Sequence, residues 1–131
     1  MIRSEIVVGK TDHGKLMRLA NGLMERNPDL AEELVGELER ASVADDAAIP
    51  AGTVQMGSTV EYRTGGDPPR RVTLVYPVDA DIAQGRISIL TPVGTALLGL
   101  SVGQTIDFVA NDGRQHLMTI VSVEEGSDAA A

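Results

Sequence analysis

The residues of this chain that are able to do chemistry are mostly carboxylates, and they form two groups. Asp79 and Asp81 stand two positions apart in a loop-like segment, while Asp29, Glu32 and Glu33 stand together further upstream. Oxygen donors are the ligands that hard divalent cations prefer. Both groups also have simpler roles, because the first solvates a loop and the second lies in the first turn of a helix, where acids are favoured. Either group could bind a divalent ion weakly, but neither has a nearby histidine and apolar pocket for acid–base catalysis.

Other reactive side chains are few and scattered. His13 and His116 lie in different halves of the chain without a second ligand at helical or hairpin spacing, and no serine has the G-x-S-x-G context of a nucleophile. The nearest approach to a phosphate-binding loop, Thr64-Gly65-Gly66, connects two predicted strands, so a hairpin turn is the favoured interpretation. The absence of cysteine excludes disulfides, thiol chemistry and cysteine-bound zinc. We therefore predict no catalytic residue, metal, cofactor or enzymatic activity.

The composition favours a protein partner over nucleic acid or membrane. The 131 residues carry a net charge of -8; residues 1–48 hold six basic and ten acidic side chains, and residues 49–131 hold five and nine. Neither half offers the basic patch that specific duplex binding needs, and one Phe and two Tyr are too few for base stacking. No signal peptide or run of about 20 apolar residues is present, so we expect a cytoplasmic protein.

The first half of the chain has the apolar spacing of two helices. Thr11 or Asp12 is the expected cap of the first helix, and Asn27-Pro28 ends it and starts the second. Their connection is so short that the helices must fold back as an antiparallel hairpin, a short coiled coil. The two apolar stripes comprise Leu16, Leu19, Ala20, Leu23 and Met24 in the first helix, and Leu30, Leu34, Leu38 and Ala41 in the second.

The second half changes to the alternation of β-strands after a linker at residues 44–52. Strands are predicted at 54–62, 72–76, 87–89, 106–108 and 118–123, and Asn111-Asp112-Gly113 is a strong hairpin signal between the last two. A short helix starts at Pro92 and ends near Gly99. The chain is thus predicted to be an α+β protein, with a helical hairpin at 1–48 and an antiparallel β domain with one short helix at 49–131.

Two sets of motifs resemble known families. The first set consists of Asp79-Ala80-Asp81, Gly85, Ile87-Ser88-Ile89, the run from Thr91 to Gly99, and Val102-Gly103. Together these motifs resemble the C-terminal domain of the bacterial GreA/GreB transcript-cleavage factors, which has an FKBP-like fold. Over residues 2–125 the chain resembles a narrower group, the Rnk family of regulators of nucleoside diphosphate kinase. The motifs that carry this second resemblance are ELERA at 37–41, MGSTVEYR at 56–63, TLVYP at 73–77 and TPVGTALLGL at 91–100.

The resemblance implies binding to RNA polymerase near its secondary channel. The expected docking residues are Asp79, Asp81, Thr91, Pro92, Val93 and Leu97, although Leu97 and Leu98 also suit the core. Gre factors cleave transcripts with acids at the tip of a long coiled coil, whereas each helix here, about 14 residues long, reaches roughly 20 Å. The tip, at Arg26, Asn27, Pro28 and Asp29, has no compact acidic cluster. We therefore expect a modulator or competitor of Gre factors without cleavage activity.

Two alternatives remain from the sequence. The FKBP-like fold allows a peptidyl-prolyl isomerase, but the three aromatic residues, Tyr62, Tyr76 and Phe108, are too few to line a proline pocket. The Rnk resemblance allows direct regulation of nucleotide metabolism, although no residue pattern indicates contact with a kinase. The oligomeric state is expected to be a monomer or a weak homodimer.

Overall fold

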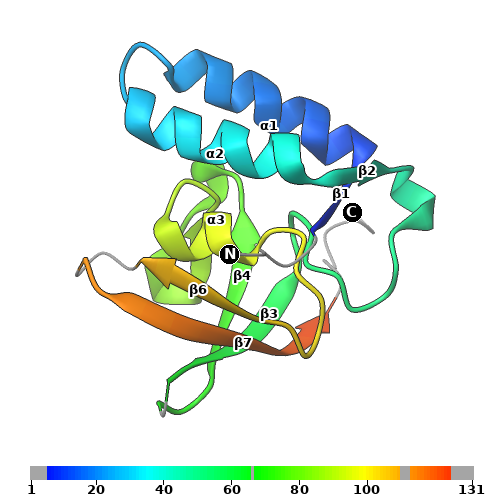
Figure 1. Ribbon diagram of the computed structural model, residues 1–131, viewed down its shortest axis with the longest axis vertical. Helices are drawn as coiled ribbons and strands as arrows, with labels where there is room; N and C mark the ends of the chain where they lie inside the picture. The colour runs from blue at the N-terminus through cyan, green and yellow to red at the C-terminus, as the bar shows by residue number, and fades with distance from the viewer. Residues whose placement is uncertain (1–5, 66, 110–112, 125–131) are drawn as a thin grey trace.

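The N-terminal part of the computed structural model, which describes residues 6–65, 67–109 and 113–124, is a hairpin of two packed helices (Figure 1). Strand β1 (Val7–Gly9) leads into α1 (Lys10–Leu23), and α2 (Pro28–Arg40) returns into β2 (Ser42–Ala44). The helical hairpin confirms the prediction. The pairing of β1 with β2 was not predicted; it is parallel and closes the base of the hairpin.

The two helices begin in different ways. Asn27 caps α2 as predicted, because its side-chain oxygen accepts a hydrogen bond from the N–H of Leu30 at 3.3 Å. The predicted cap of α1 is wrong, since the N-cap is Gly9, which has no side chain, and Thr11 lies inside the first turn. The N–H of Thr11 instead donates to Oδ1 of Asp46 at 3.1 Å, and its hydroxyl donates to Oδ2 at 2.5 Å. A residue from the linker therefore caps α1 in three dimensions.

The second half forms a five-stranded sheet in the order β5-β4-β3-β7-β6. Its strands are β3 (Thr59–Thr64), β4 (Arg70–Val75), β5 (Arg86–Ser88), β6 (Thr105–Val109) and β7 (Gln115–Glu124). Three of the four neighbouring pairs are antiparallel, as predicted. The pair β4 and β5 is parallel, so the sheet is mixed rather than wholly antiparallel. The reason is that residues 76–85 carry the chain back along β4 before β5 starts.

Two other predictions about this sheet concern the start of its first strand and the connection between its last two. The strand expected from Val54 begins only at Thr59, because Gly57 has a φ of 87° and turns the chain before it. Of the hairpin signal at 111–113, residues 111 and 112 lie outside the described residues. The strands on either side of it, β6 and β7, do pair in antiparallel register.

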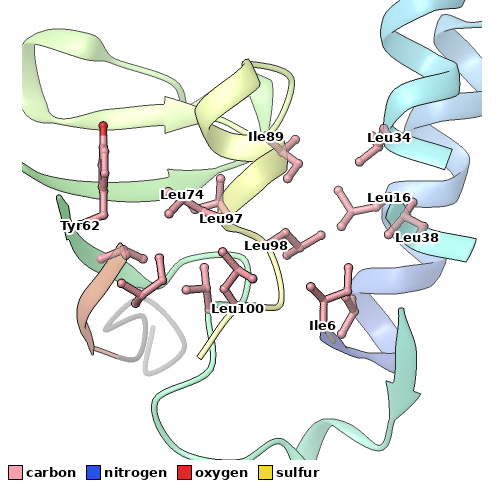
Figure 2. Close-up of a cluster of buried hydrophobic side chains, with 14 of the residues drawn as sticks. Ile6, Leu16, Leu34, Leu38, Tyr62, Leu74, Ile89, Leu97, Leu98 and Leu100 are labelled. Carbon is pink, nitrogen blue, oxygen red and sulfur yellow. The ribbon is translucent and has the colours of Figure 1, made fainter. Parts of the chain in front are cut away.

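The short helix α3 (Pro92–Leu97) lies between the sheet and the helical hairpin. Figure 2 shows Leu97 near Leu74 of the sheet, and Leu98 on the side of Leu16 of the hairpin. These four side chains have relative exposures of 0–1% and belong to one continuous core. The hairpin is therefore packed against the β domain along part of its length instead of projecting freely.

Close packing around α3 depends on glycine at two positions. A Cβ on Gly94 would lie 2.2 Å from the carbonyl oxygen of Ser88, and a Cβ on Gly99, whose φ is +82°, would lie 2.6 Å from Cβ of Ile6. We expect Gly94→Ala and Gly99→Ala each to lower the free energy of unfolding by about 1–3 kcal/mol. Urea denaturation followed by circular dichroism measures this change.

The matched control is Gly36→Ala on α2, where a Cβ would meet nothing within 4 Å. Because alanine favours helix over glycine, this variant should be more stable than the wild type by about 1 kcal/mol. A Gly94→Ala protein as stable as the wild type would contradict the packing described for α3.

Candidate functional site

The two aspartates singled out by the sequence lie in a loop of residues 77–85, called the acidic loop below. It consists of two 3-10 turns, Pro77–Asp79 and Ile82–Gln84. The N–H of Asp79 donates to the carbonyl oxygen of Tyr76 at 2.9 Å. Asp81 and Arg86 exchange two backbone hydrogen bonds, each of 2.9 Å. Backbone bonds thus hold the acidic loop in shape, and both aspartate side chains are exposed.

Two apolar side chains of the acidic loop are also exposed. Val78 has a relative exposure of 89% and Ile82 of 86%, and both exceed every other exposed large hydrophobic residue among those described. Apolar side chains presented beside charges on a fixed loop are typical of protein contact sites. The sequence analysis named the aspartates but missed these two residues. The sequence did indicate that these two residues could be exposed, since each is apolar in a segment that Pro77 and Gly85 separate from the strands.

The second predicted group lies at the start of α3. Thr91 caps the helix, because its hydroxyl oxygen accepts from the N–H of Gly94 at 3.0 Å and its O–H donates to the carbonyl oxygen of Ser88 at 2.8 Å. Pro92 and Val93 are half-buried, and Val93 packs against the core. Leu97 is fully buried, which agrees with its interpretation as a core residue and leaves its side chain out of reach of a partner.

The structure connects the acidic loop to the start of α3 through β5. Both 3-10 turns of the loop contact β5, and the end of β5 is tied to Thr91 through Ser88. The hairpin tip at residues 26–29 is a separate exposed region at the end of the helices far from β1 and β2 (Figure 1). The predicted site residues therefore fall into a surface on the β domain and a tip on the hairpin.

A half-buried tyrosine stands immediately before the acidic loop. The hydroxyl of Tyr76 donates to Oδ1 of Asp12 in α1 at 2.9 Å. Burial raises the pKa of the Asp12 carboxyl, while the bond from Tyr76 and the charge of Lys15 oppose this change. Burial also raises the pKa of the Tyr76 phenol, and the negative charge of Asp12 raises it further. The phenol is therefore a stable donor between the two halves of the chain.

Two features of the described residues concern metal ions and membranes. No group of three or more His, Asp or Glu side chains among them is arranged to hold a metal ion. Within the same residues, no helix has the length and apolar character that crossing a membrane requires. What the acidic loop presents is two carboxylates and two apolar side chains in a fixed arrangement.

Comparison with known proteins gives matches to both halves of the chain. A family model described as the C-terminal domain of transcription elongation factor GreA/GreB matches residues 49–125, and one described as the Rnk N-terminus matches residues 5–43. The chain is 31% identical to the regulator of nucleoside diphosphate kinase from Escherichia coli K12, over 99% of this chain and 96% of that protein.

Two further relatives belong to the Gre factors. The chain is 40% identical to transcription elongation factor GreA from Xylella fastidiosa M12, over 71% of this chain and 60% of that protein. The solved structure of a GreA/GreB transcription elongation factor from Nitrosomonas europaea is 38% identical and superposes with a TM-score of 0.74, covering 91% of this chain and 98% of the other. The fold expected from the motifs is thus confirmed.

The contact between Tyr76 and Asp12 predicts how the phenol titrates. The chain has two tyrosines and no tryptophan, so in a Tyr62→Phe protein the ultraviolet absorbance of phenolate reports on Tyr76 alone. We expect its pKa to lie well above the usual value of about 10. Asp12→Asn should lower this pKa but not fully restore the usual value, because burial remains.

The sign of the effect on stability follows from proton binding. Above about pH 10 the unfolded chain loses the phenol proton while the folded chain keeps it, so the free energy of unfolding should fall as the pH rises. If Asp12→Asn leaves the pKa of the Tyr76 phenol unchanged, the contact with Asp12 does not form in solution.

Proposed function

The chain belongs to the GreA/GreB transcription factor family, in the branch defined by the Rnk N-terminus, and on this premise we propose that it regulates transcription by binding RNA polymerase. The proposed contact is the acidic loop, with Pro92 and Val93 at its rim, docked near the secondary channel. The proposed role is non-enzymatic: the protein modulates the polymerase or competes with Gre factors there.

The observation that carries this proposal is the arrangement of side chains on the acidic loop. Val78 and Ile82 are almost fully exposed, while the backbone that holds them is fixed by the bonds between Asp81 and Arg86. A fixed loop loses little conformational freedom on binding. Two apolar side chains supply area that becomes buried, and two carboxylates steer the loop towards a basic surface. Together these features suit a protein partner with an apolar patch bordered by Lys and Arg.

The short hairpin supports a role without transcript cleavage. Helix α1 has 14 residues, which corresponds to about 21 Å. The buried residues Leu16, Leu34 and Leu38 hold part of the hairpin against the β domain, so only the remainder can extend towards a partner. The exposed turn at the tip contains Arg26 and Asn27, with Asp29 as its one acid. Such a tip lacks the group of carboxylates needed to hold a catalytic metal ion.

Substitutions in the acidic loop test the apolar part of the proposed contact. A Val78→Ser/Ile82→Ser protein should bind purified RNA polymerase about tenfold more weakly or worse, because truncating apolar anchors removes most of the burial energy of a small interface. Surface plasmon resonance measures the change. The matched control is Val43→Ser/Leu117→Ser, which changes side chains that are 50% and 56% exposed elsewhere, and should bind like the wild type.

The two aspartates of the proposed contact are expected to affect the rate of binding. Asp79→Asn/Asp81→Asn should lower the association rate and weaken its dependence on salt, because the carboxylates steer the approach to a basic surface. Asp67→Asn/Asp107→Asn removes the same charge from other exposed positions and serves as the control. Equal rates for the two double variants would place the contact outside the acidic loop.

Competition with a Gre factor tests the function itself. Polymerase stalled on a template should cleave its transcript when a Gre factor is added, and rising amounts of this protein should slow the cleavage, whereas this protein alone should cause none. The Val78→Ser/Ile82→Ser variant should not slow it. Undiminished cleavage at saturating wild-type protein would refute competition, and cleavage by the protein alone would refute the non-enzymatic role.

A further inference from the structure

Tyr76 is bonded in two directions at once. Its carbonyl oxygen accepts a hydrogen bond from the N–H of Asp79 at 2.9 Å, which belongs to the first turn of the acidic loop. Its hydroxyl donates to Oδ1 of Asp12 in α1, also at 2.9 Å and 64 positions away in the sequence. One residue thus connects the acidic loop to the helical hairpin, by its backbone on one side and its side chain on the other.

Other polar contacts between the hairpin and the rest of the chain secure its base. The side-chain amide of Gln55 accepts from the N–H of Gly9 at 2.9 Å and donates to the carbonyl oxygen of Val7 at 2.7 Å. Asp46 binds the backbone and hydroxyl of Thr11. These contacts secure the segment around β1, but they do not reach the acidic loop. The bond between Tyr76 and Asp12 does.

Apolar packing alone would leave the direction of the hairpin weakly defined. Figure 2 shows Leu16 and Leu34 of the hairpin facing Leu98 and Ile89 of the β domain. The hydrophobic effect that drives contacts between aliphatic side chains is non-directional, so it does not by itself specify one angle between the two layers. A hydrogen bond requires a defined distance and angle. The bond from Tyr76 to Asp12 therefore supplies the directional constraint on the side of the acidic loop.

Breaking this bond is costly because both partners are half-buried. A carboxylate that is partly removed from water needs a donor, and a donor to an ionised group makes a strong hydrogen bond. The nearby charges of Lys15 and Arg18 in α1 favour the ionised forms of Asp12 and Tyr76 respectively, whereas Asp46 opposes ionisation of Asp12. An arrangement of the hairpin that separates Tyr76 from Asp12 would leave the carboxylate with less compensation.

We propose that Tyr76 is a positioning residue that fixes the direction of the helical hairpin relative to the acidic loop, so that docking of the loop also determines where the hairpin tip lies on the partner. The role of Tyr76 at the polymerase rests on the proposed function. The geometric part of the proposal, that Tyr76 fixes the direction of the hairpin, concerns the free protein alone. The two parts are tested by separate measurements.

Distances between two spin labels test the geometric part. The chain has no cysteine, so Glu25→Cys, at the exposed position just before the tip, and Ala83→Cys in the acidic loop can be labelled without other changes. In the wild-type background we expect a narrow distance distribution by pulsed electron paramagnetic resonance. Tyr76→Phe, which keeps the ring but lacks the donor, and Asp12→Ala, which lacks the acceptor, should both broaden or shift it. Tyr62→Phe, which removes the other phenol hydroxyl, should leave it unchanged.

The outcomes for the free protein are decisive. Circular dichroism and a thermal melt establish that each variant is folded. A folded Tyr76→Phe protein with the wild-type distance distribution would overturn the proposal. If Tyr76→Phe changes the distribution but Asp12→Ala does not, the hydrogen bond is not the constraint and the proposal likewise fails.

Photo-crosslinking tests the part of the proposal that concerns the partner. With a crosslinker at Arg26 in the tip, the wild type should give one dominant product with RNA polymerase, and Tyr76→Phe should give less of it, or several products, at unchanged affinity. The same single product from Tyr76→Phe would refute the effect on the tip. If even the wild type does not bind polymerase, the proposed function fails, while the label distances still decide whether Tyr76 fixes the hairpin.

Discussion

The structure depends on the packing of one short segment, residues 91–100, between two layers. Leu97, the last residue of α3, faces the sheet, and Leu98, the next residue, faces the helical hairpin, so the segment closes the core on both sides. This arrangement requires close backbone approach, because Gly94 lies against the carbonyl of Ser88 and Gly99 lies against Ile6. Because dense apolar packing provides most of the stability of a domain of this size, the hairpin and the sheet depend on each other through this segment.

The same packing explains why the hairpin is not a free arm. Helices of 14 and 13 residues are marginal in isolation, and here their apolar stripes are buried against each other and against the β domain. The polar contacts from Asp46, Gln55 and Tyr76 then fix the base and direction of the hairpin. A short, fixed hairpin differs in reach from a long projecting coil. This difference underlies the proposal that the protein acts at the polymerase without performing the chemistry of a cleavage factor.

Local sequence signals predicted the elements whose stability is local. Asn27-Pro28 and Thr91-Pro92 start helices where expected, because a side-chain cap and a proline at the first position act within one turn. The parallel pairing of β5 escaped prediction because the direction of a strand depends on the path of the whole crossing segment. For the candidate site, the aspartates carried a recognisable motif. Val78 and Ile82 carried no such motif, and an apolar residue is expected in the core unless the fold shows that it is exposed.

The sequence by itself determined the two N-terminal helices, the approximate strands, the short helix that starts at Pro92 and the family to which the chain belongs. These follow from periodicity, capping residues and ordered motifs, which are properties of neighbouring residues. Only the tertiary structure decided that Asp46 caps α1, that Tyr76 reaches Asp12, and that the acidic loop presents two apolar side chains to solvent. The physical reason is that the two contacts join residues far apart in the chain, and that the exposure of a side chain depends on how the layers pack.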